Sequence, residues 1–160
     1  EQTNAFFRLA HRLIQDVTVA ISYSEHARKS VVVPVYNDPE GIQTILGSLL
    51  TQTTNHQLAV IDDDSADRTP EVVRSYDDAR LSLCREAEIQ SSYAARNTGI
   101  RNTDVDRLAF VDADTTVPED WLDSTLQTRQ STDADYVGCQ VEVTLPETPH
   151  HPARDDHHTG

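Results

Sequence analysis

The sequence predicts an α/β fold with a mostly parallel sheet flanked by helices. Short apolar runs read VVVPV at residues 31–35, LAVI at 58–61 and RLAFV at 107–111. Segments with helical periodicity lie between these runs, and polar or acidic residues follow each of them. Strands that alternate with helices favour parallel pairing through right-handed crossovers. We therefore expect one Rossmann-like sheet whose strand ends carry the polar residues.

The helix after the first strand is the clearest element. Asp38 is suited to the N-cap and Pro39 to the first helical position. Apolar residues then recur at i, i+3, i+4, i+7 and i+8: Ile42, Ile45, Leu46, Leu49 and Leu50. The other expected elements are a strand at 58–61, a helix at 69–76, a strand at 81–84, a helix capped by Ser91 or Ser92 and running to residue 100, a strand at 107–111, a helix at 118–130 and a final strand at 136–143.

Both ends of the chain differ from this pattern. Residues 1–30 show a helical stripe and are expected to form an N-terminal helical extension of unclear role. Residues 146–160 contain three prolines and two histidine pairs without periodicity, and we expect a disordered tail there. The domain proper is expected at residues 31–145. Because the sequence contains no Met, we expect it to be a fragment or a processed product.

The composition excludes some partners. The 160 residues include 27 acidic and 13 basic side chains, for a net charge of −14, which argues against binding nucleic acid through a basic surface. Lys29 is the only lysine, and an Asp-rich, Lys-poor composition favours a halophilic source. Cys84 and Cys139 are expected to be small core residues. With no apolar run of ~20 residues, we expect a cytoplasmic protein that can act at the inner face of the membrane.

Two acidic segments follow predicted strands. Asp112-Ala113-Asp114 comes directly after the strand at 107–111, and Asp62-Asp63-Asp64-Ser65 follows the strand at 58–61. Carboxylates separated by one residue suit a hard divalent cation, which often takes its other ligands from substrate phosphates. The carboxyl ends of strands in an open α/β sheet are where ligands usually bind. The sequence therefore predicts a site for Mg²⁺ or Mn²⁺ at that edge of the sheet.

Four segments in order resemble the family 2 glycosyltransferases, which have the nucleotide-sugar-binding GT-A fold. The segments are VVVPVYND (31–38), AVIDDDSADRT (59–69), SSYAARNTGIRN (91–102) and LAFVDADTTVPEDWL (108–122). The resemblance implies a nucleoside diphosphate sugar as donor, Mg²⁺ or Mn²⁺ as cofactor, inversion at the sugar, and transfer to a glycan or lipid-linked acceptor. It covers the N-terminal, donor-binding portion of such an enzyme.

The resemblance also implies roles for individual residues. Asp63 would bond the edge of the base, and Tyr36 would lie on the base or the ribose; the alternative for Tyr36, which the resemblance makes the weaker one, is that it only caps the core. Asp114 would ligate the cation, and Asp112 would meet the ribose, a metal-bound water or the metal. Arg96 would neutralise the diphosphate or simply pair with a surface acid. The full set of expected donor residues is Pro34, Val35, Tyr36, Asn37, Asp63, Arg96, Asp112 and Ala113.

One departure from the family pattern concerns the turn after the second strand. The family usually has Gly where this chain has Asp64, so we expect a left-handed turn that Asp tolerates better than most residues.

The catalytic base is not identified. Inverting transfer needs a group that deprotonates the acceptor, and in the family it comes from a later segment. Asp155 and Asp156 lie in the predicted tail, out of any such context. We therefore expect this chain to bind donor without transferring sugar, and a non-catalytic or degenerate nucleotide-sugar-binding fragment stays open as an alternative. A response-regulator receiver and a haloacid-dehalogenase-type phosphatase also use such acids, but each needs a downstream lysine that this sequence lacks.

Overall fold

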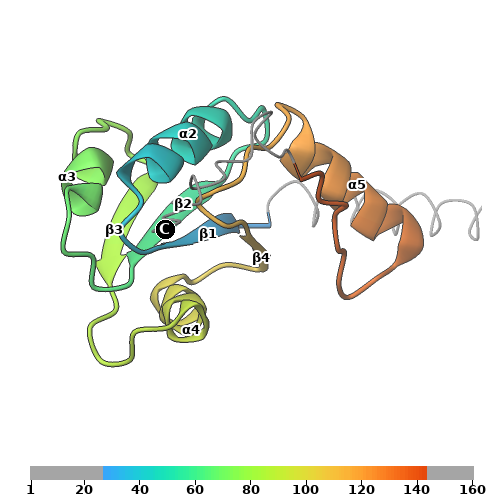
Figure 1. The fold of residues 1–160 in the computed structure, drawn as a ribbon. Coiled ribbons are helices and arrows are strands. Elements are labelled where there is room, and N and C mark those ends of the chain that lie inside the picture. The colour runs from blue at the N-terminus through green and yellow to red at the C-terminus, as the bar shows by residue number, and fades with distance from the viewer. Residues whose placement is uncertain (1–26, 144–160) are drawn as a thin grey trace, which may run out of the picture. The chain divides into compact units, whose positions relative to one another are not determined.

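The computed structural model describes residues 27–143, and eight helices and strands are assigned within that range (Figure 1). In chain order they are β1 (Lys29–Val35), α2 (Pro39–Leu50), β2 (Gln57–Asp62), α3 (Thr69–Arg74), β3 (Leu81–Arg85), α4 (Ser92–Asn102), β4 (Arg107–Phe110) and α5 (Trp121–Thr132).

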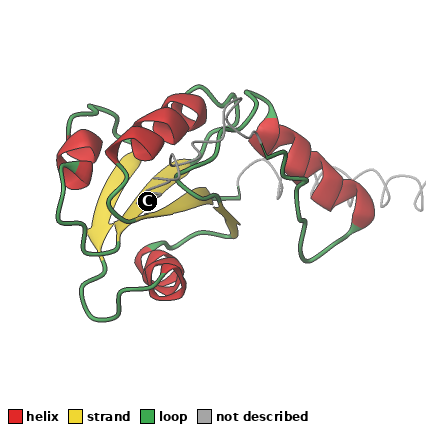
Figure 2. Cartoon of the chain, viewed as in Figure 1, coloured by secondary structure: helices red, strands yellow, loops and turns green. Residues whose placement is uncertain are grey.

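The strands form one parallel sheet in the order β3-β2-β1-β4 (Figure 2). Val33 of β1 is in register with Val60 of β2, and Val31 with Ala109 of β4. Because all four strands run the same way, their carboxyl ends meet at one edge. The predicted parallel α/β sheet is confirmed.

Helices α2 and α3 cover one face of this sheet and α4 covers the other (Figure 1). The predicted N-cap of α2 is correct, since Asp38 Oδ1 accepts the Gly41 N–H at 2.8 Å. The predicted apolar stripe is buried except at half-buried Leu50. Fully buried side chains come mainly from β1, β2 and α2: Val31, Val32, Val33, Leu58, Val60, Ile61, Ile42, Ile45, Leu46 and Leu49.

Helix α4 packs very close to the sheet. Its buried residues are all small: Ala94, Ala95, Thr98 and Gly99. A Cβ atom built on Gly99 would lie 2.4 Å from Val32 Cγ1. The absence of a side chain at position 99 therefore sets the distance between α4 and β1.

Three expectations about the elements are wrong. The helix expected from Pro118 begins at Trp121, because residues 119–120 form a turn in which the Trp121 N–H bonds the Pro118 carbonyl at 3.0 Å. Residues 136–143 form no strand, and Tyr136 there is 85% exposed. A strand needs a neighbour for its backbone groups, and no described strand pairs with this segment. Cys139 is accordingly exposed rather than in a core, while Cys84 packs half-buried on the sheet.

The chain divides into two compact units, Glu1–Ser124 and Thr125–Gly160. The sheet and the helices that cover it belong to the first unit. In the second, the Thr125 hydroxyl lies 3.6 Å from Cys139 Sγ. The predicted N-terminal extension falls mostly on residues 1–26, outside the described part, and Lys29 and Ser30 already belong to β1. The predicted tail at 146–160 also lies outside it.

Candidate donor-binding site at the carboxyl edge of the sheet

The polar residues that follow the strands are held by hydrogen bonds that extend the sheet. The Asp63 N–H donates to the Val35 carbonyl at 2.9 Å, and the Glu86 N–H donates to the Asp62 carbonyl at 2.8 Å. On the β4 side, the Val111 N–H donates to the Val32 carbonyl at 3.2 Å, one residue before Asp112. The turns after β1, β2, β3 and β4 therefore share one edge.

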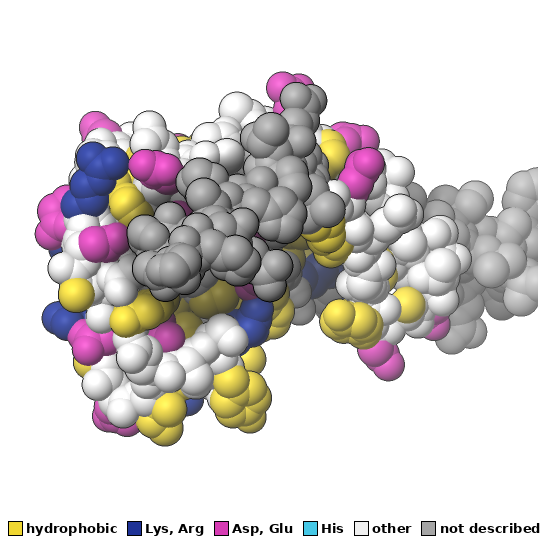
Figure 3. All heavy atoms as spheres, viewed as in Figure 1, with side chains coloured by type: hydrophobic (Ala, Val, Ile, Leu, Met, Phe, Trp, Pro, Cys, Tyr) yellow, Lys and Arg dark blue, Asp and Glu magenta, His cyan; other side chains and the backbone are white. Residues whose placement is uncertain are grey.

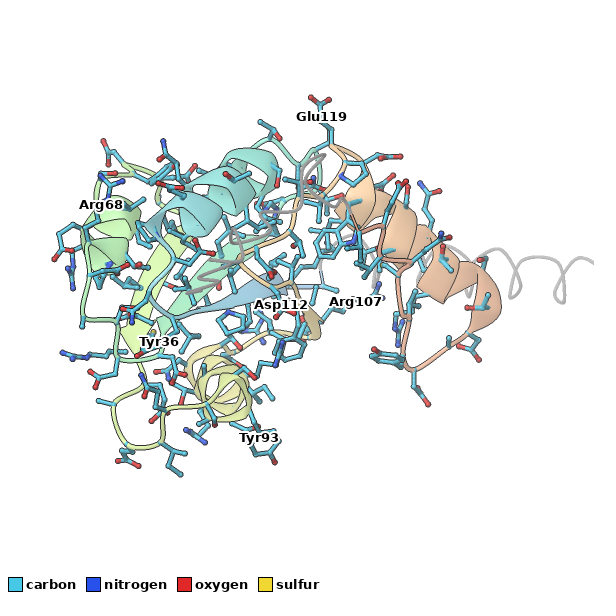
Figure 4. All side chains as sticks on the ribbon, in the orientation of Figure 1. Tyr36, Arg68, Tyr93, Arg107, Asp112 and Glu119 are labelled. Carbon is cyan, nitrogen blue, oxygen red and sulfur yellow. The ribbon has the colours of Figure 1, made fainter. Side chains whose placement is uncertain are left out.

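The turn after β1 is fastened to the turn after β2. The Asn37 N–H donates to Ser65 Oγ at 2.9 Å, and Asn37 Oδ1 accepts the Ala66 N–H at 2.8 Å. Asn37 has a φ of 47°, which an Asn tolerates better than most residues. Tyr36 beside it is 50% exposed on the loop that leaves β1 (Figure 4). Tyr36 does not pack into the core, so its ring is accessible to a ligand.

Pro34 and Val35 are buried in β1, unlike the two residues that follow them. Pro34 is in register with Ile61 of the neighbouring strand. With their side chains in the interior, these two residues present only backbone at the sheet edge.

Asp63 is a buried carboxylate at the centre of this edge. Its Oδ1 accepts the Ser91 N–H at 3.3 Å. Burial raises the pKa of Asp63, and the nearby negative charges of Glu86, Asp62 and Asp64 raise it further, while the Ser91 N–H opposes the shift. The protein therefore keeps an acceptor with little solvation at this position.

The turn expected after Asp63 is present. Asp64 has a φ of 63°, in the left-handed region that glycine favours. Its carboxylate forms an ion pair with Arg85 at the end of β3. That ion pair lies on the surface, where such a pair contributes little stability but fixes a side-chain position.

Asp112 and Asp114 occupy the turn that follows β4. The Asp112 carboxylate forms an ion pair with Arg96 of α4, and the Asp112 carbonyl accepts the Thr115 hydroxyl at 2.7 Å. Asp114 is exposed, and the Ala113 side chain between the two acids is buried. Arg96 therefore pairs with an acid, which was one of the two alternatives predicted for it. That acid, Asp112, is itself one of the predicted site residues.

The chemistry of this turn suits a cation that is completed by a ligand. Within residues 27–143, no group of three or more His, Cys, Asp or Glu side chains is arranged to hold a metal ion. Mg²⁺ sites commonly use one or two carboxylates together with phosphate oxygens and water. Exposed Asp114, with Asp112 two residues before it, offers that number of protein ligands.

Glu86 was not predicted from the sequence. It follows β3 directly and is 6% exposed. Its Oε1 accepts the N–H groups of Glu88 and Ile89 at 2.8 and 3.2 Å, and its Oε2 accepts the Thr98 hydroxyl. These donors lower its pKa, the Thr98 hydroxyl most of all. The rule that identified Asp63, an acid at the end of a predicted strand, also applies to Glu86.

Comparison with known proteins identifies the family. The sequence model for "Glycosyl transferase family 2" matches residues 30–157. Glycosyltransferase AglE of Haloferax volcanii is 40% identical over 122 residues, which are 73% of this chain and 40% of AglE. A glucosyltransferase of Escherichia coli, "UDP-Glc:alpha-D-GlcNAc-diphosphoundecaprenol beta-1,3-glucosyltransferase WfgD", is 35% identical over 86 residues, 53% of this chain and 34% of that enzyme.

Solved structures with the same fold include a mannosyltransferase and the protein TarS. The mannosyltransferase PcManGT from Pyrobaculum calidifontis, in complex with GDP-Man and Mn²⁺, superposes with a TM-score of 0.60 at 29% identity, over 64% of this chain and 32% of PcManGT. TarS of S. aureus (residues 1–349) gives a TM-score of 0.60 at 27% identity, over 68% of this chain and 34% of that structure.

These relatives are longer than this chain, which spans 40% of AglE and 34% of WfgD. Among residues 27–143, no helix is both long and apolar enough to cross a bilayer. The family match removes the receiver and phosphatase interpretations of the acidic turns. The chain belongs to glycosyl transferase family 2, and its parallel sheet with helices on both faces is the GT-A fold of that family.

Proposed function

We propose that this chain binds a nucleoside diphosphate sugar together with Mg²⁺ or Mn²⁺, as the donor-binding part of a glycosyltransferase. The observation that supports this most directly is the arrangement of acids at one sheet edge. Buried Asp63 follows β2, and exposed Asp112 and Asp114 follow β4. The likeness to PcManGT, solved with GDP-Man and Mn²⁺, supports the same ligand class. In this proposal residues 31–145 form the donor-binding domain.

The base and ribose would be bound by the turns after β1 and β2. The Asp63 carboxylate accepts a hydrogen bond from a base N–H, and a hydrogen bond to a desolvated acceptor is stronger than one in water. The accessible Tyr36 ring stacks on the base or packs on the ribose. The backbone of residues 34–37 lies along the nucleoside.

The diphosphate would lie between the turn after β4 and α4. Asp114 would hold the cation, which would stabilise the negative charge on the leaving nucleoside diphosphate. Asp112 turns from Arg96 to the ribose or to a metal-bound water, and buried Ala113 leaves the space between the two carboxylates clear. Arg96, released from Asp112, then pairs with the diphosphate.

The acceptor is proposed to be a glycan or a lipid-linked glycan, with inversion at the sugar carbon and action at the inner face of the membrane. The relative WfgD, whose name specifies a diphosphoundecaprenol-linked substrate, supports a lipid-linked acceptor. Inversion requires a base for the acceptor hydroxyl, and no residue of this chain is assigned to that role. Donor binding without transfer would support the alternative of a non-catalytic binding fragment.

The test is calorimetric titration of the 160-residue chain with UDP, GDP and their sugars, in Mn²⁺, in Mg²⁺ and in chelator. We expect tighter binding with metal, and Asp114→Ala should abolish that difference. Asp77→Ala is a matched control because it removes one exposed carboxylate just before β3, at the opposite edge of the sheet. Equal affinity with metal and with chelator would contradict the proposal.

A further inference from the structure

Glu86 holds the loop that joins β3 to α4. Its Oε1 accepts two N–H groups of that loop, from Glu88 at 2.8 Å and Ile89 at 3.2 Å. Its Oε2 accepts the Thr98 hydroxyl on α4 and lies 3.8 Å from Arg101 Nη2. One carboxylate thus joins the start of the loop to the helix that follows it.

The far end of the same loop contacts Asp63. Ser91 donates its backbone N–H to Asp63 Oδ1 at 3.3 Å. The Ser91 hydroxyl also accepts the Ala94 N–H at 3.1 Å and so caps α4. A connected set of hydrogen bonds therefore runs from Glu86 through the loop to the acceptor proposed to bind the base.

Apolar burial contributes little to holding this loop. Residues 87–90 are all exposed, including Ile89 at 64%. Burying a carboxylate is costly unless donors compensate for the lost water. Glu86 receives three hydrogen bonds and is ionised at neutral pH, because those donors lower its pKa. The hydrogen bonds that stabilise the buried charge of Glu86 therefore also hold the loop in place.

We propose that Glu86 is a positioning residue for nucleobase recognition. It fixes the β3–α4 loop so that the Ser91 N–H donates to Asp63 Oδ1. This hydrogen bond orients the Asp63 carboxylate toward the base. This inference rests on the proposed donor binding and adds a determinant of base affinity that does not touch the ligand.

The experiment compares Glu86→Ala with Glu86→Gln by calorimetry in Mn²⁺, using UDP or GDP, whichever the wild type binds more tightly, and inorganic pyrophosphate. Glu86→Ala removes the acceptor of the three hydrogen bonds that hold the loop, so nucleoside diphosphate binding should weaken by about tenfold or more. Pyrophosphate affinity should not change, because pyrophosphate has no base. Glutamine keeps an oxygen for the loop amides and offers an N–H to Thr98, so Glu86→Gln should stay within about threefold of the wild type.

Val73→Ala is the control for a loss of stability that does not involve the loop. Val73 is buried in α3, away from this loop, so its truncation lowers stability without changing the ratio of nucleoside diphosphate to pyrophosphate affinity. As a measurement without ligand, the exchange rate of the Ser91 amide should rise in Glu86→Ala and not in Glu86→Gln. If Glu86→Ala does not fold, Thr98→Val removes one donor to Glu86 at constant shape and should shift the ratio in the same direction.

Two outcomes separate the failures. If the wild type binds no nucleoside diphosphate, the proposed function fails and the role of Glu86 fails with it. If the wild type binds but Glu86→Ala leaves the ratio of nucleoside diphosphate to pyrophosphate affinity unchanged, the role of Glu86 alone is overturned.

Discussion

At the scale of single residues, Asp63 shows how a binding group can oppose stability. Its carboxyl is buried near three other acids, and burial is the largest cause of its raised pKa. Asp78 is the opposite case: hydrogen bonds from Arg80 lower its pKa to about 2, and Arg80 also donates to the Leu50 carbonyl at 3.1 Å. The first carboxyl lies at the proposed donor site, and the second holds Arg80, which bonds the last residue of α2.

We expect Asp63→Asn to stabilise the protein at neutral pH. A carboxyl whose folded pKa is raised binds its proton more tightly in the folded state, so stability falls as pH rises through the interval between the two pKa values. Asparagine has no charge to bury and keeps an oxygen for the Ser91 N–H. In urea titrations the gain should be present at pH 7 and vanish below the unfolded pKa of ~3.9. A less stable variant at pH 7 would be inconsistent with this account.

We expect the reverse for Asp78→Asn. The depressed pKa of Asp78 contributes stability above the unfolded pKa of ~3.9, and that contribution is lost as pH falls toward about 2. The variant should therefore be less stable than the wild type at pH 7, with the difference closing in acid. Asp77→Ala, which changes the exposed neighbouring acid, is the control. A deficit that does not depend on pH would rule out the ionic explanation.

At the scale of elements, α4 is positioned by its small residues. The Gly99 Cα faces Val32, a stiff β-branched side chain in the centre of the sheet. The same helix presents Arg96 to Asp112, Thr98 to Glu86 and Ser91, its N-cap, to Asp63. Close packing of α4 therefore sets the position of three contacts at the proposed site.

Substituting alanine at two helical glycines should have opposite effects. Gly99→Ala places a Cβ 2.4 Å from Val32 Cγ1, and overpacking of this kind typically costs about 1–3 kcal/mol. Gly47 in α2 has nothing within 4 Å of a built Cβ, so Gly47→Ala should add about 0.5–1 kcal/mol through helix propensity. Urea denaturation of both variants measures the difference. Equal effects would show that α4 can move away from the sheet at no cost.

At the scale of the whole molecule, the excess of acidic side chains dominates the electrostatics. There are 27 acidic and 13 basic residues, and acidic side chains are spread over the described surface in view rather than gathered in one patch (Figure 3). In some of the described ion pairs, such as Arg28–Asp104, both side chains are more than half exposed. Such pairs contribute little to stability. Repulsion among carboxylates is therefore the main long-range term.

We expect the melting temperature to rise between dilute buffer and about 1 M KCl, where the screening length falls to ~3 Å. Screening reduces repulsion among the surplus acids more than it weakens the few surface ion pairs. Thermal unfolding followed by circular dichroism at several KCl concentrations gives the measurement. A melting temperature that is flat or falls with salt would rule out a salt-adapted surface, in spite of the Haloferax relative.

The sequence by itself determined the elements and the acids that end them. Periodicity fixed the buried face of α2, and Asp38 and Pro39 fixed its start. The acids at 62–64 and 112–114 fall at or just after the ends of strands whose local patterns are strong. These features depend on neighbours within a few residues. Tertiary structure decided which acids have partners: Arg96 with Asp112, Ser91 with Asp63, and Thr98 with buried Glu86. It also decided that residues 136–143 form no strand, because a strand exists only where another strand completes its hydrogen bonds, and that partner is not encoded in the segment itself.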